Sequence, residues 1–416
     1  MRKISKISLV AAVAVAGFST ANAQPLEEAI KNVDVSGSVV YRYDNFHNDG
    51  NLANGGATDS TSGKNNYKIG LNLSSKVNDY VKFNSRFIVG DPNGSLGFAG
   101  LDAKANGDQP VGVDLSQAYF GFTAIPNTVV NVGKQGLTTP YTVATDINGN
   151  EQTGTGILAL STFGPITAGA GYFNQTNLQN TPDINGFGGN KINGTNLSLT
   201  GTENLYVATV QGDLDFVKLE AWYLGAQDTF NSYTLAATSS IDLAENAKIG
   251  LEARYVNLKL DSDAAVFGGV TPSSDDRKND MMRLAVDGKF SIVNARLAYT
   301  KTGKHGGLTA LDQDAKNTSL GWAITSNAVA DADYYQAALG ADILDNLNFT
   351  LNYGNLKSKE NADDLKQQEV YGQLTYKMSK NLTTYLRYGN VEEKEVSTGN
   401  KQIDQNRGRI QVAYTF

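Results

Sequence analysis

Apolar and polar side chains alternate along most of the chain. The alternation runs through segments of about 8 to 11 residues, and clear examples are 33–42, 67–74, 217–223, 249–255 and 347–353. A period of two residues is typical of a β-strand with one apolar face. About eighteen such segments follow one another up to the last residue. The pattern therefore predicts an all-β protein.

The links between these segments are alternately short and long. Short links are 76–79, 163–165, 211–215 and 378–381, and long links rich in Gly, Asn and Asp are 45–65, 91–112, 175–202, 259–279 and 301–333. A long loop at every second connection is unusual in a compact soluble domain. It is typical of an outer-membrane barrel, which has short periplasmic turns and long external loops.

The segments also have the properties that a membrane imposes on strands. Strands can cross lipid only as a closed sheet, because every backbone N–H and C=O must be paired within the protein. Aromatic residues mark many segment ends, as interfacial girdles require: Tyr41, Tyr43, Tyr255, Tyr299, Tyr353 and Tyr388. The last segment ends in Phe416, and no fixed repeat indicates a soluble solenoid. We therefore predict a transmembrane antiparallel β-barrel of about 18 strands.

The first 23 residues have the pattern of a cleaved signal peptide. Arg2, Lys3 and Lys6 precede a short apolar stretch, and Ala21-Asn22-Ala23 supplies small residues before a cleavage site. About 12 apolar residues would cover only about 18 Å of a hydrocarbon core of about 30 Å, which argues against a membrane anchor. The mature chain is then expected to be a single β-barrel domain over 24–416. The formal net charge is −7 for the full sequence and −10 after removal of Arg2, Lys3 and Lys6, and this acidic balance disfavours nucleic-acid binding.

Charged residues occupy the polar positions of the predicted strands. The cations are Arg42, Lys68, Lys82, Arg86, Lys218, Arg254, Arg283, Arg296, Arg387, Arg407 and Arg409, and the acids are Asp34, Glu220, Glu252, Asp287 and Glu369. A cation facing lipid costs about 2 to 4 kcal/mol at midplane, so this face must line a wet lumen. The wall then carries about +6 and the rest of the mature chain about −16. Barrels of 16 to 18 strands leave an aqueous channel.

Residues 136–156 are the candidate constriction loop. We expect Asp146 and Glu151 to face Arg42, Lys82 and Arg86 and to create a transverse field in the lumen. The alternative is an ordinary external loop with solvated acids. Acids at the mouths and constriction favour a weak preference for cations, although the wall attracts anions. The pattern at 129–132 leaves the direction of Lys134 open.

Two regions resemble a known family. Residues 25–37, followed by Tyr41-Arg42-Tyr43, resemble the mature amino terminus of the Campylobacter-type major outer membrane protein, a family of porins. The run Gly133-Lys134-Gln135, with Thr145-Asp146 and Gly154-Thr155-Gly156, is similar to the third-loop region of that family. The resemblance implies an 18-stranded, usually trimeric, water-filled channel in a Gram-negative outer membrane, in contact with lipid and lipopolysaccharide. The loops between these regions diverge, so loop functions do not transfer.

Other chemistry has weak support in the sequence. Asp146, Asn148 and Asn150 have the spacing of the first ligands of a calcium-binding loop, but Glu151 occupies the position where the turn needs Gly. We therefore expect no cofactor, and bound calcium is the less favoured alternative. The glycines of 154–156 match a dinucleotide fingerprint by letters only. His47 and His305 lie in loops without a Ser or Asp pattern around them, so we expect no enzyme activity.

The sequence therefore predicts a general porin that lets small hydrophilic solutes and ions diffuse passively. Two alternatives stay open. The barrel could act mainly in adhesion or surface structure through its long loops. It could also be a substrate-specific channel with an aromatic slide that contains Tyr119, Tyr371 and Tyr385.

Overall fold

The computed structural model describes most of the region predicted to be mature. The described residues are 32–49, 59–91, 96–102, 111–180, 191–192, 195–196, 199–262, 274–275, 277–360 and 363–416. The predicted signal peptide, 1–23, lies outside them. Within this part of the chain, no helix is long and apolar enough to cross a membrane.

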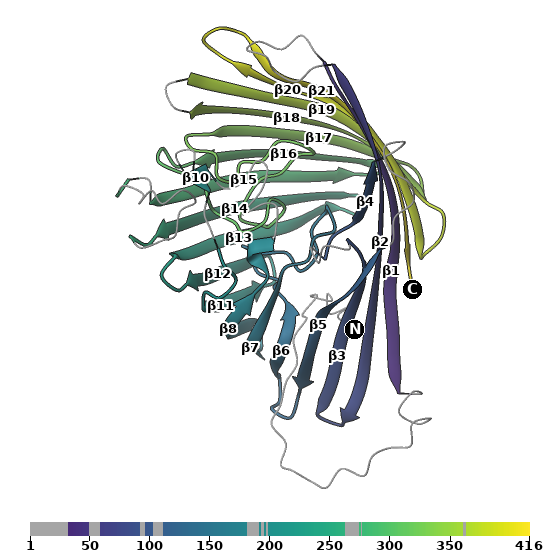
Figure 1. Cartoon of the computed structure of the whole chain (residues 1–416), viewed down its shortest axis with the longest axis vertical. Coiled ribbons are helices and arrows are strands. Elements are labelled where there is room, and N and C mark those ends of the chain that lie inside the picture. The colour runs from purple at the N-terminus through teal and green to yellow at the C-terminus, as the bar shows by residue number, and fades with distance from the viewer. Residues whose placement is uncertain are drawn as a thin grey trace.

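Eighteen long antiparallel strands form a closed barrel (Figure 1), which confirms the predicted fold class. The first eight are β1 (Val33–Asn48), β2 (Ser60–Asn78), β3 (Val81–Gly90), β5 (Gly112–Phe122), β6 (Thr128–Gly136), β7 (Thr153–Phe163), β8 (Ile166–Thr176) and β11 (Leu205–Leu214). The next ten are β12 (Val217–Ala226), β13 (Phe230–Ala244), β14 (Ala247–Leu260), β15 (Lys278–Phe290), β16 (Val293–Thr302), β17 (Asp333–Leu344), β18 (Leu347–Glu360), β19 (Asp363–Lys377), β20 (Leu382–Glu395) and β21 (Lys401–Thr415).

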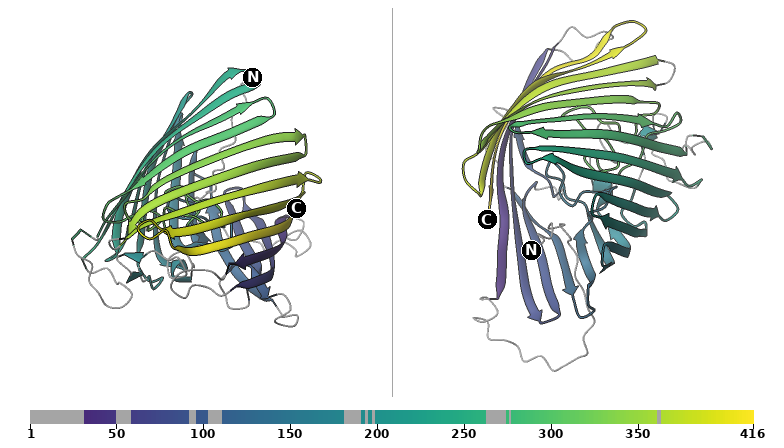
Figure 2. Two further views of the ribbon diagram at one scale, coloured as in Figure 1. Left: turned by 90° about the horizontal axis from the view of Figure 1, so that it is seen from above. Right: turned by 180° about the vertical axis from the view of Figure 1, so that it is seen from behind.

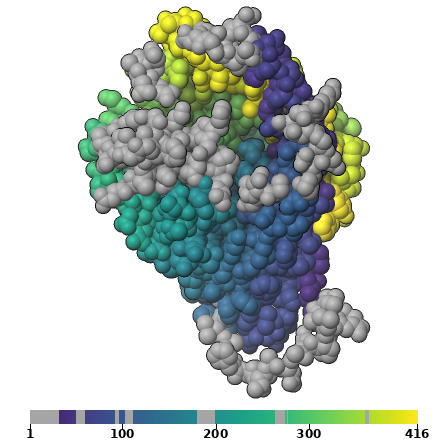
Figure 3. Space-filling model, viewed as in Figure 1, coloured from purple at the N-terminus to yellow at the C-terminus, as the bar shows by residue number. Residues whose placement is uncertain are grey.

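Pairing of the first and last strands closes the barrel. Tyr41 of β1 lies opposite Val412 of β21, and the backbone groups of Gly37 and Phe416 exchange two hydrogen bonds at 2.9 and 3.1 Å. Figures 2 and 3 show β1, in purple, beside β21, in yellow. Closure gives each of the eighteen long strands a hydrogen-bonded neighbour on both sides, as a membrane-spanning sheet requires.

Three short strands and one helical turn complete the secondary structure of the described residues. Strand β4 (Ala99–Asp102) pairs with β2 at one rim, β9 (Lys191–Ile192) pairs with β10 (Thr195–Asn196), and Leu178–Asn180 form a 3₁₀ turn.

The strands turn their apolar side chains outward. In β13, the exposed Tyr233 and Leu235 alternate with the buried Ser232 and Thr234. Outward tyrosines of neighbouring strands contact one another: their ring centroids are 5.6 Å apart for Tyr41–Tyr67, 5.4 Å for Tyr172–Tyr206 and 4.9 Å for Tyr299–Tyr335. An apolar outer surface with aromatic contacts is the surface that lipid and its interfaces favour.

Several strands reverse this polarity near the end with the long links. In β14, Val256, Leu258 and Leu260 are buried inside, whereas Lys259 on the opposite face is exposed. The reversal follows Tyr255, so these residues are those expected where a strand leaves the bilayer and meets water outside and packed protein inside. The inner surface is therefore only partly polar, whereas the alternation of side chains predicted a polar lumen face along each strand.

Connections at one end are tight turns, as predicted. At the opposite end, the link 301–333 differs from the prediction of an external loop. It folds into the barrel, where Leu308, Leu311 and Ile324 are buried. Burial of these apolar side chains removes them from water and stabilises the inward position of the link. The other predicted long links lie partly outside the described residues.

Candidate functional site

Two segments fold into the barrel and narrow it. The first inner loop, 137–152, joins β6 to β7, and the second inner loop, 303–332, joins β16 to β17. The first contains the centre of the predicted constriction loop. Its Tyr141 is fully buried, and Thr234 of β13 donates a hydrogen bond to the Tyr141 hydroxyl at 2.9 Å. The first inner loop therefore reaches from its own strands across to β13.

Glu151 attaches the first inner loop to the wall. Its carboxylate is fully buried and accepts hydrogen bonds from Lys68 of β2 at 2.9 Å, Arg86 of β3 at 2.7 Å, and Ser116 of β5. Burial alone would raise the pKa of Glu151, but the hydrogen bond from Arg86 and the charge of Lys68 hold that pKa below its usual value. The structure brings Glu151 together with Arg86, as expected, and adds Lys68 and Ser116.

Cations of the early strands also hold the backbone of this loop. Arg42 of β1 donates to the carbonyl of Ile147 at 2.7 Å, and Lys68 donates to the carbonyl of Gly149. Gly149 has a φ of +84°, and a Cβ there would lie 2.5 Å from the Phe98 ring, so the turn requires glycine. These contacts set the loop against the wall in one position.

Asp146 has a local role in the turn. One carboxylate oxygen accepts the backbone N–H of Asn150 at 2.7 Å, and the other accepts the Asn150 side-chain amide at 2.8 Å. The carboxylate thus shapes the turn that precedes Glu151.

The structure places Lys82 and Lys134 away from this cluster. Lys82 has the inward parity of Arg86 but stands four residues earlier on β3, about 13 Å along the strand, and is exposed. No hydrogen bond or ion pair joins Lys82 to the first inner loop among the described residues. Lys134 alternates with the buried Asn131 and Gln135, so its side chain belongs to the outer face.

The second inner loop packs directly against the first. The backbone N–H of Leu311 donates to the carbonyl of Tyr141 at 2.8 Å, and that of Asn317 donates to the carbonyl of Pro140 at 2.9 Å. The Gln152 side chain returns a hydrogen bond to the carbonyl of Leu311 at 2.7 Å. The two loops therefore form one unit inside the lumen.

Two wall residues anchor the second inner loop. The Glu369 carboxylate of β19 accepts the backbone N–H groups of Trp322 and Ala323 at 3.0 and 2.8 Å. Arg283 of β15 donates to the carbonyl of Lys316 at 2.8 Å and to that of Thr318. Both residues were predicted to face the lumen, but their contacts with a loop were not foreseen.

The charges on β14 to β16 compensate one another. Glu252 lies 2.6 Å from Arg283, 3.3 Å from Arg254 and 3.3 Å from Arg296, and Arg296 also pairs with Asp287 at 2.6 Å. Two further predicted wall residues also make ion pairs, and one of them, Glu220, joins this group through Arg254 at 3.8 Å. Glu220 lies 3.3 Å from Lys316 of the second inner loop, and Lys218 lies 2.7 Å from Asp213.

Three arginines surround one indole on the other side of the lumen. The guanidinium carbons of Arg387, Arg407 and Arg409 lie 5.2, 5.5 and 5.9 Å from the ring centroid of Trp322. Arg409 pairs with the carboxylate of Asp44, whereas Arg387 donates to an amide oxygen of Gln373 and Arg407 donates to the Trp322 carbonyl. Positive charge is therefore less compensated here than on β14 to β16.

The predicted aromatic slide is divided between two places. Tyr371 and Tyr385 both lie beside Arg387, each with its ring centroid 5.3 Å from the guanidinium carbon. Tyr119 lines a cavity beside the first inner loop.

A closed barrel with an apolar exterior, a charged inner wall and two loops folded inside is the architecture of an outer-membrane β-barrel protein. The chain belongs to the Campylobacter major outer membrane protein family, whose sequence profile matches residues 1–416. This match confirms the resemblance seen in the sequence. No curated protein sequence matches the chain.

Solved structures share the fold at low sequence identity. Acinetobacter baumannii OccAB3 is 14% identical, with a TM-score of 0.70 over 92% of this chain and 99% of that one. Pseudomonas aeruginosa OpdL is 15% identical, with a TM-score of 0.68 over 93% and 99%. Pseudomonas aeruginosa OpdQ is also 15% identical, with a TM-score of 0.66 over 94% and 99%.

Proposed function

We propose that the protein is a porin that lets small hydrophilic solutes and ions diffuse through the outer membrane. The observation that carries the proposal is the direction of the charged side chains. The cations with inward parity are Arg42, Lys68, Lys82 and Arg86 on β1 to β3, Arg254, Arg283 and Arg296 on β14 to β16, and Arg387, Arg407 and Arg409 on β20 and β21. Several of them reach polar groups of the two inner loops. Such a wall is stable only if the remaining lumen holds water.

The two inner loops are the proposed constriction. They replace an open cylinder by a narrower passage between loop surface and wall, and their fixed hydrogen bonds keep that passage in one shape. Solutes would be selected by size and by the field at the passage, without a motor, a cofactor or a catalytic residue.

The proposed ion preference is weakly for cations. About −16 of the mature charge lies outside the strand positions assigned to the lumen, so the mouths and loops concentrate cations. Arg387 and Arg407 oppose this effect from within the lumen, which keeps the preference weak.

We further propose that residues 1–23 are removed on export and that 24–416 form a single porin domain. The mature barrels would assemble as trimers in contact with lipid and lipopolysaccharide. Native mass spectrometry of the protein extracted from outer membranes tests the cleavage site and the trimer together. A monomer with an uncleaved amino terminus would contradict both.

Planar-bilayer recording and liposome swelling test the proposed channel. We expect discrete conductance steps, a small cation-selective reversal potential in a KCl gradient, and swelling rates that fall as uncharged solutes grow. Circular dichroism of the same preparation verifies that the barrel is folded. A folded β-protein that gives neither conductance steps nor swelling would favour the alternative role in adhesion or surface structure.

A further inference from the structure

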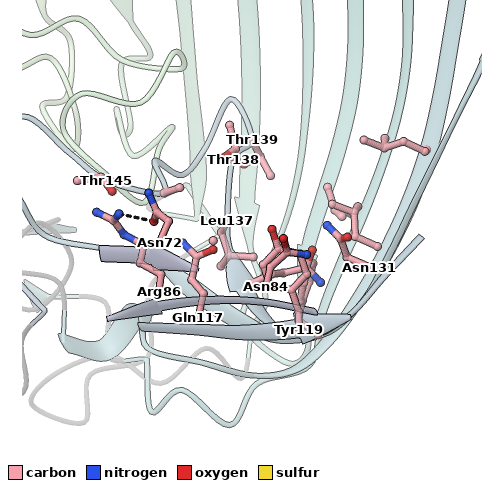
Figure 4. Close-up of a pocket in the computed structure, with 18 of the residues that line it drawn as sticks. Asn72, Asn84, Arg86, Gln117, Tyr119, Asn131, Leu137, Thr138, Thr139 and Thr145 are labelled. Carbon is pink, nitrogen blue, oxygen red and sulfur yellow. Dashed lines mark hydrogen bonds between the residues drawn. The ribbon is translucent and has the colours of Figure 1, made fainter. Parts of the chain in front are cut away.

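A cavity of about 480 Å³ lies between the first inner loop and the inner wall (Figure 4). Its polar side is formed by side-chain amides of β2, β3, β5 and β6: Asn72, Asn84, Gln117 and Asn131. An apolar part of the lining is formed by Leu158, Val207 and the ring of Trp222. The cavity has the size and the mixed lining of small-molecule sites, which measure about 300 to 1,000 Å³.

Two residues that line this cavity each carry a buried hydrogen-bond donor without a partner among the described residues. Gln135 is only 3% exposed, yet its side-chain nitrogen has no hydrogen-bond partner among the described residues. The indole nitrogen of Trp222 is also buried without a partner in the described part of the chain. Buried donors are normally paired, because an unpaired one costs free energy. Acceptor atoms of a bound solute would pair them.

The charges at the cavity argue against an ionic ligand. Arg86 is the one charged residue among the described lining residues, and its guanidinium already binds Glu151 and the side-chain oxygen of Asn72, each at 2.7 Å. A cationic solute would meet no carboxylate in this lining, and an anionic one would meet a cation that is already neutralised.

We propose that this cavity is a binding subsite for neutral polyhydroxylated solutes of about one or two sugar rings. Amide side chains both donate and accept, which matches hydroxyl groups, and the rings of Tyr119 and Trp222 offer apolar faces to the C–H face of a sugar. The inference deepens the proposed function and rests on it, because the cavity would be a stage in passage through the channel.

Tryptophan fluorescence tests the subsite without requiring a current. The chain has two tryptophans, so Trp322→Phe leaves Trp222 as the single reporter, and Trp222→Phe leaves Trp322 as the matched control. The full-length mature protein is titrated with sucrose in a detergent that has no sugar headgroup, with sodium glutamate and lysine hydrochloride at equal osmolality for comparison. We expect a saturable change with sucrose in Trp322→Phe and none in Trp222→Phe. A linear response, an equal response in both variants, or stronger saturation with either ionic solute would overturn the proposal.

A second variant tests the open amide. Gln135→Met keeps the side-chain length but removes the amide, and it should weaken sucrose binding by about 3- to 10-fold, the effect of one neutral hydrogen bond. Gln373→Met is the control, because Gln373 is a lumen amide outside the lining of this cavity. Equal affinities in the two variants would contradict the role of Gln135.

Planar-bilayer recording of the same protein distinguishes failure of the proposed subsite from failure of the proposed porin function. Conductance steps without saturable sucrose binding would remove the subsite and leave the porin. Saturable binding without conductance would contradict the proposed porin function and indicate a sugar-binding barrel. It would also contradict the role of the cavity as a stage in passage through a channel.

Discussion

Replacing Glu151 by Gln removes the charge that attaches the first inner loop to the wall. The buried carboxylate lies 2.9 Å from Lys68 and 2.7 Å from Arg86. Loss of one partner from a buried ion pair costs about 3 to 5 kcal/mol, because the opposite charge is left uncompensated. The glutamine oxygen still accepts one hydrogen bond, so we expect the lower end, about 3 kcal/mol.

A loss of about 3 kcal/mol changes an equilibrium constant by a factor of about 100. The strands keep their own pairing, and Tyr141 remains packed, so the barrel should fold while the attached state of the loop becomes less populated. We expect a larger and noisier single-channel conductance in planar bilayers. The reversal potential should shift towards anions, because Lys68 and Arg86 then face the lumen without their carboxylate.

Glu245→Gln is the matched control. It removes the same charge from an exposed position in the tight turn between β13 and β14. The reasoning is refuted if the Glu151→Gln and Glu245→Gln channels have the same conductance, noise and reversal potential.

Three further predictions concern the inner loops and the wall. The pKa of Glu151 is lower in the folded state than its ordinary value of 4.5. The stabilisation by the Glu151 carboxylate is therefore complete above pH 4.5 and is lost as pH falls through the lower folded pKa. Conductance should stay constant from pH 7 to about 4.5 and rise only below about 4.5. Glu369→Ala leaves the backbone N–H groups of 322–324 without their acceptor, which should destabilise the inward position of the second inner loop by about 2 kcal/mol or more. Added protease should then cleave this loop at least 10-fold faster, and an unchanged cleavage rate would contradict the prediction. Neutralising Arg387 and Arg407 as Gln should raise the cation-to-anion permeability ratio measured from reversal potentials, and a fall in that ratio would contradict the assigned field.

The strands of the barrel could be predicted because alternation is a local property. Each residue on the outer face must tolerate lipid, so the pattern appears in every spanning segment and does not depend on tertiary contacts. The contact between Glu151 and Arg86 could also be predicted, because an acid in a loop near a cationic wall is attracted to that wall.

The second inner loop could not be found by the same reasoning. Alternation tells which face of a strand is apolar, but it does not tell which long link turns inward. One signal was present: no charged residue lies between Lys316 and Asp331, which is unusual for an exposed external loop. Similarly, alternation predicts that Lys82 faces the lumen, but it does not tell at which residue of β3 the first inner loop contacts the strand. The structure shows that this contact is made by Arg86.

Thiol labelling tests the central claim of a wet interior and an apolar exterior most directly. The chain has no cysteine, so single substitutions give unambiguous sites. On β19, Gln373 faces Arg387 in the lumen, and the neighbouring Leu374 is exposed on the outer face. A charged, membrane-impermeant thiol reagent should label Gln373→Cys in bilayers and reduce its current, while leaving Leu374→Cys unlabelled and its current unchanged. Labelling of Leu374→Cys with protection of Gln373→Cys would contradict the account.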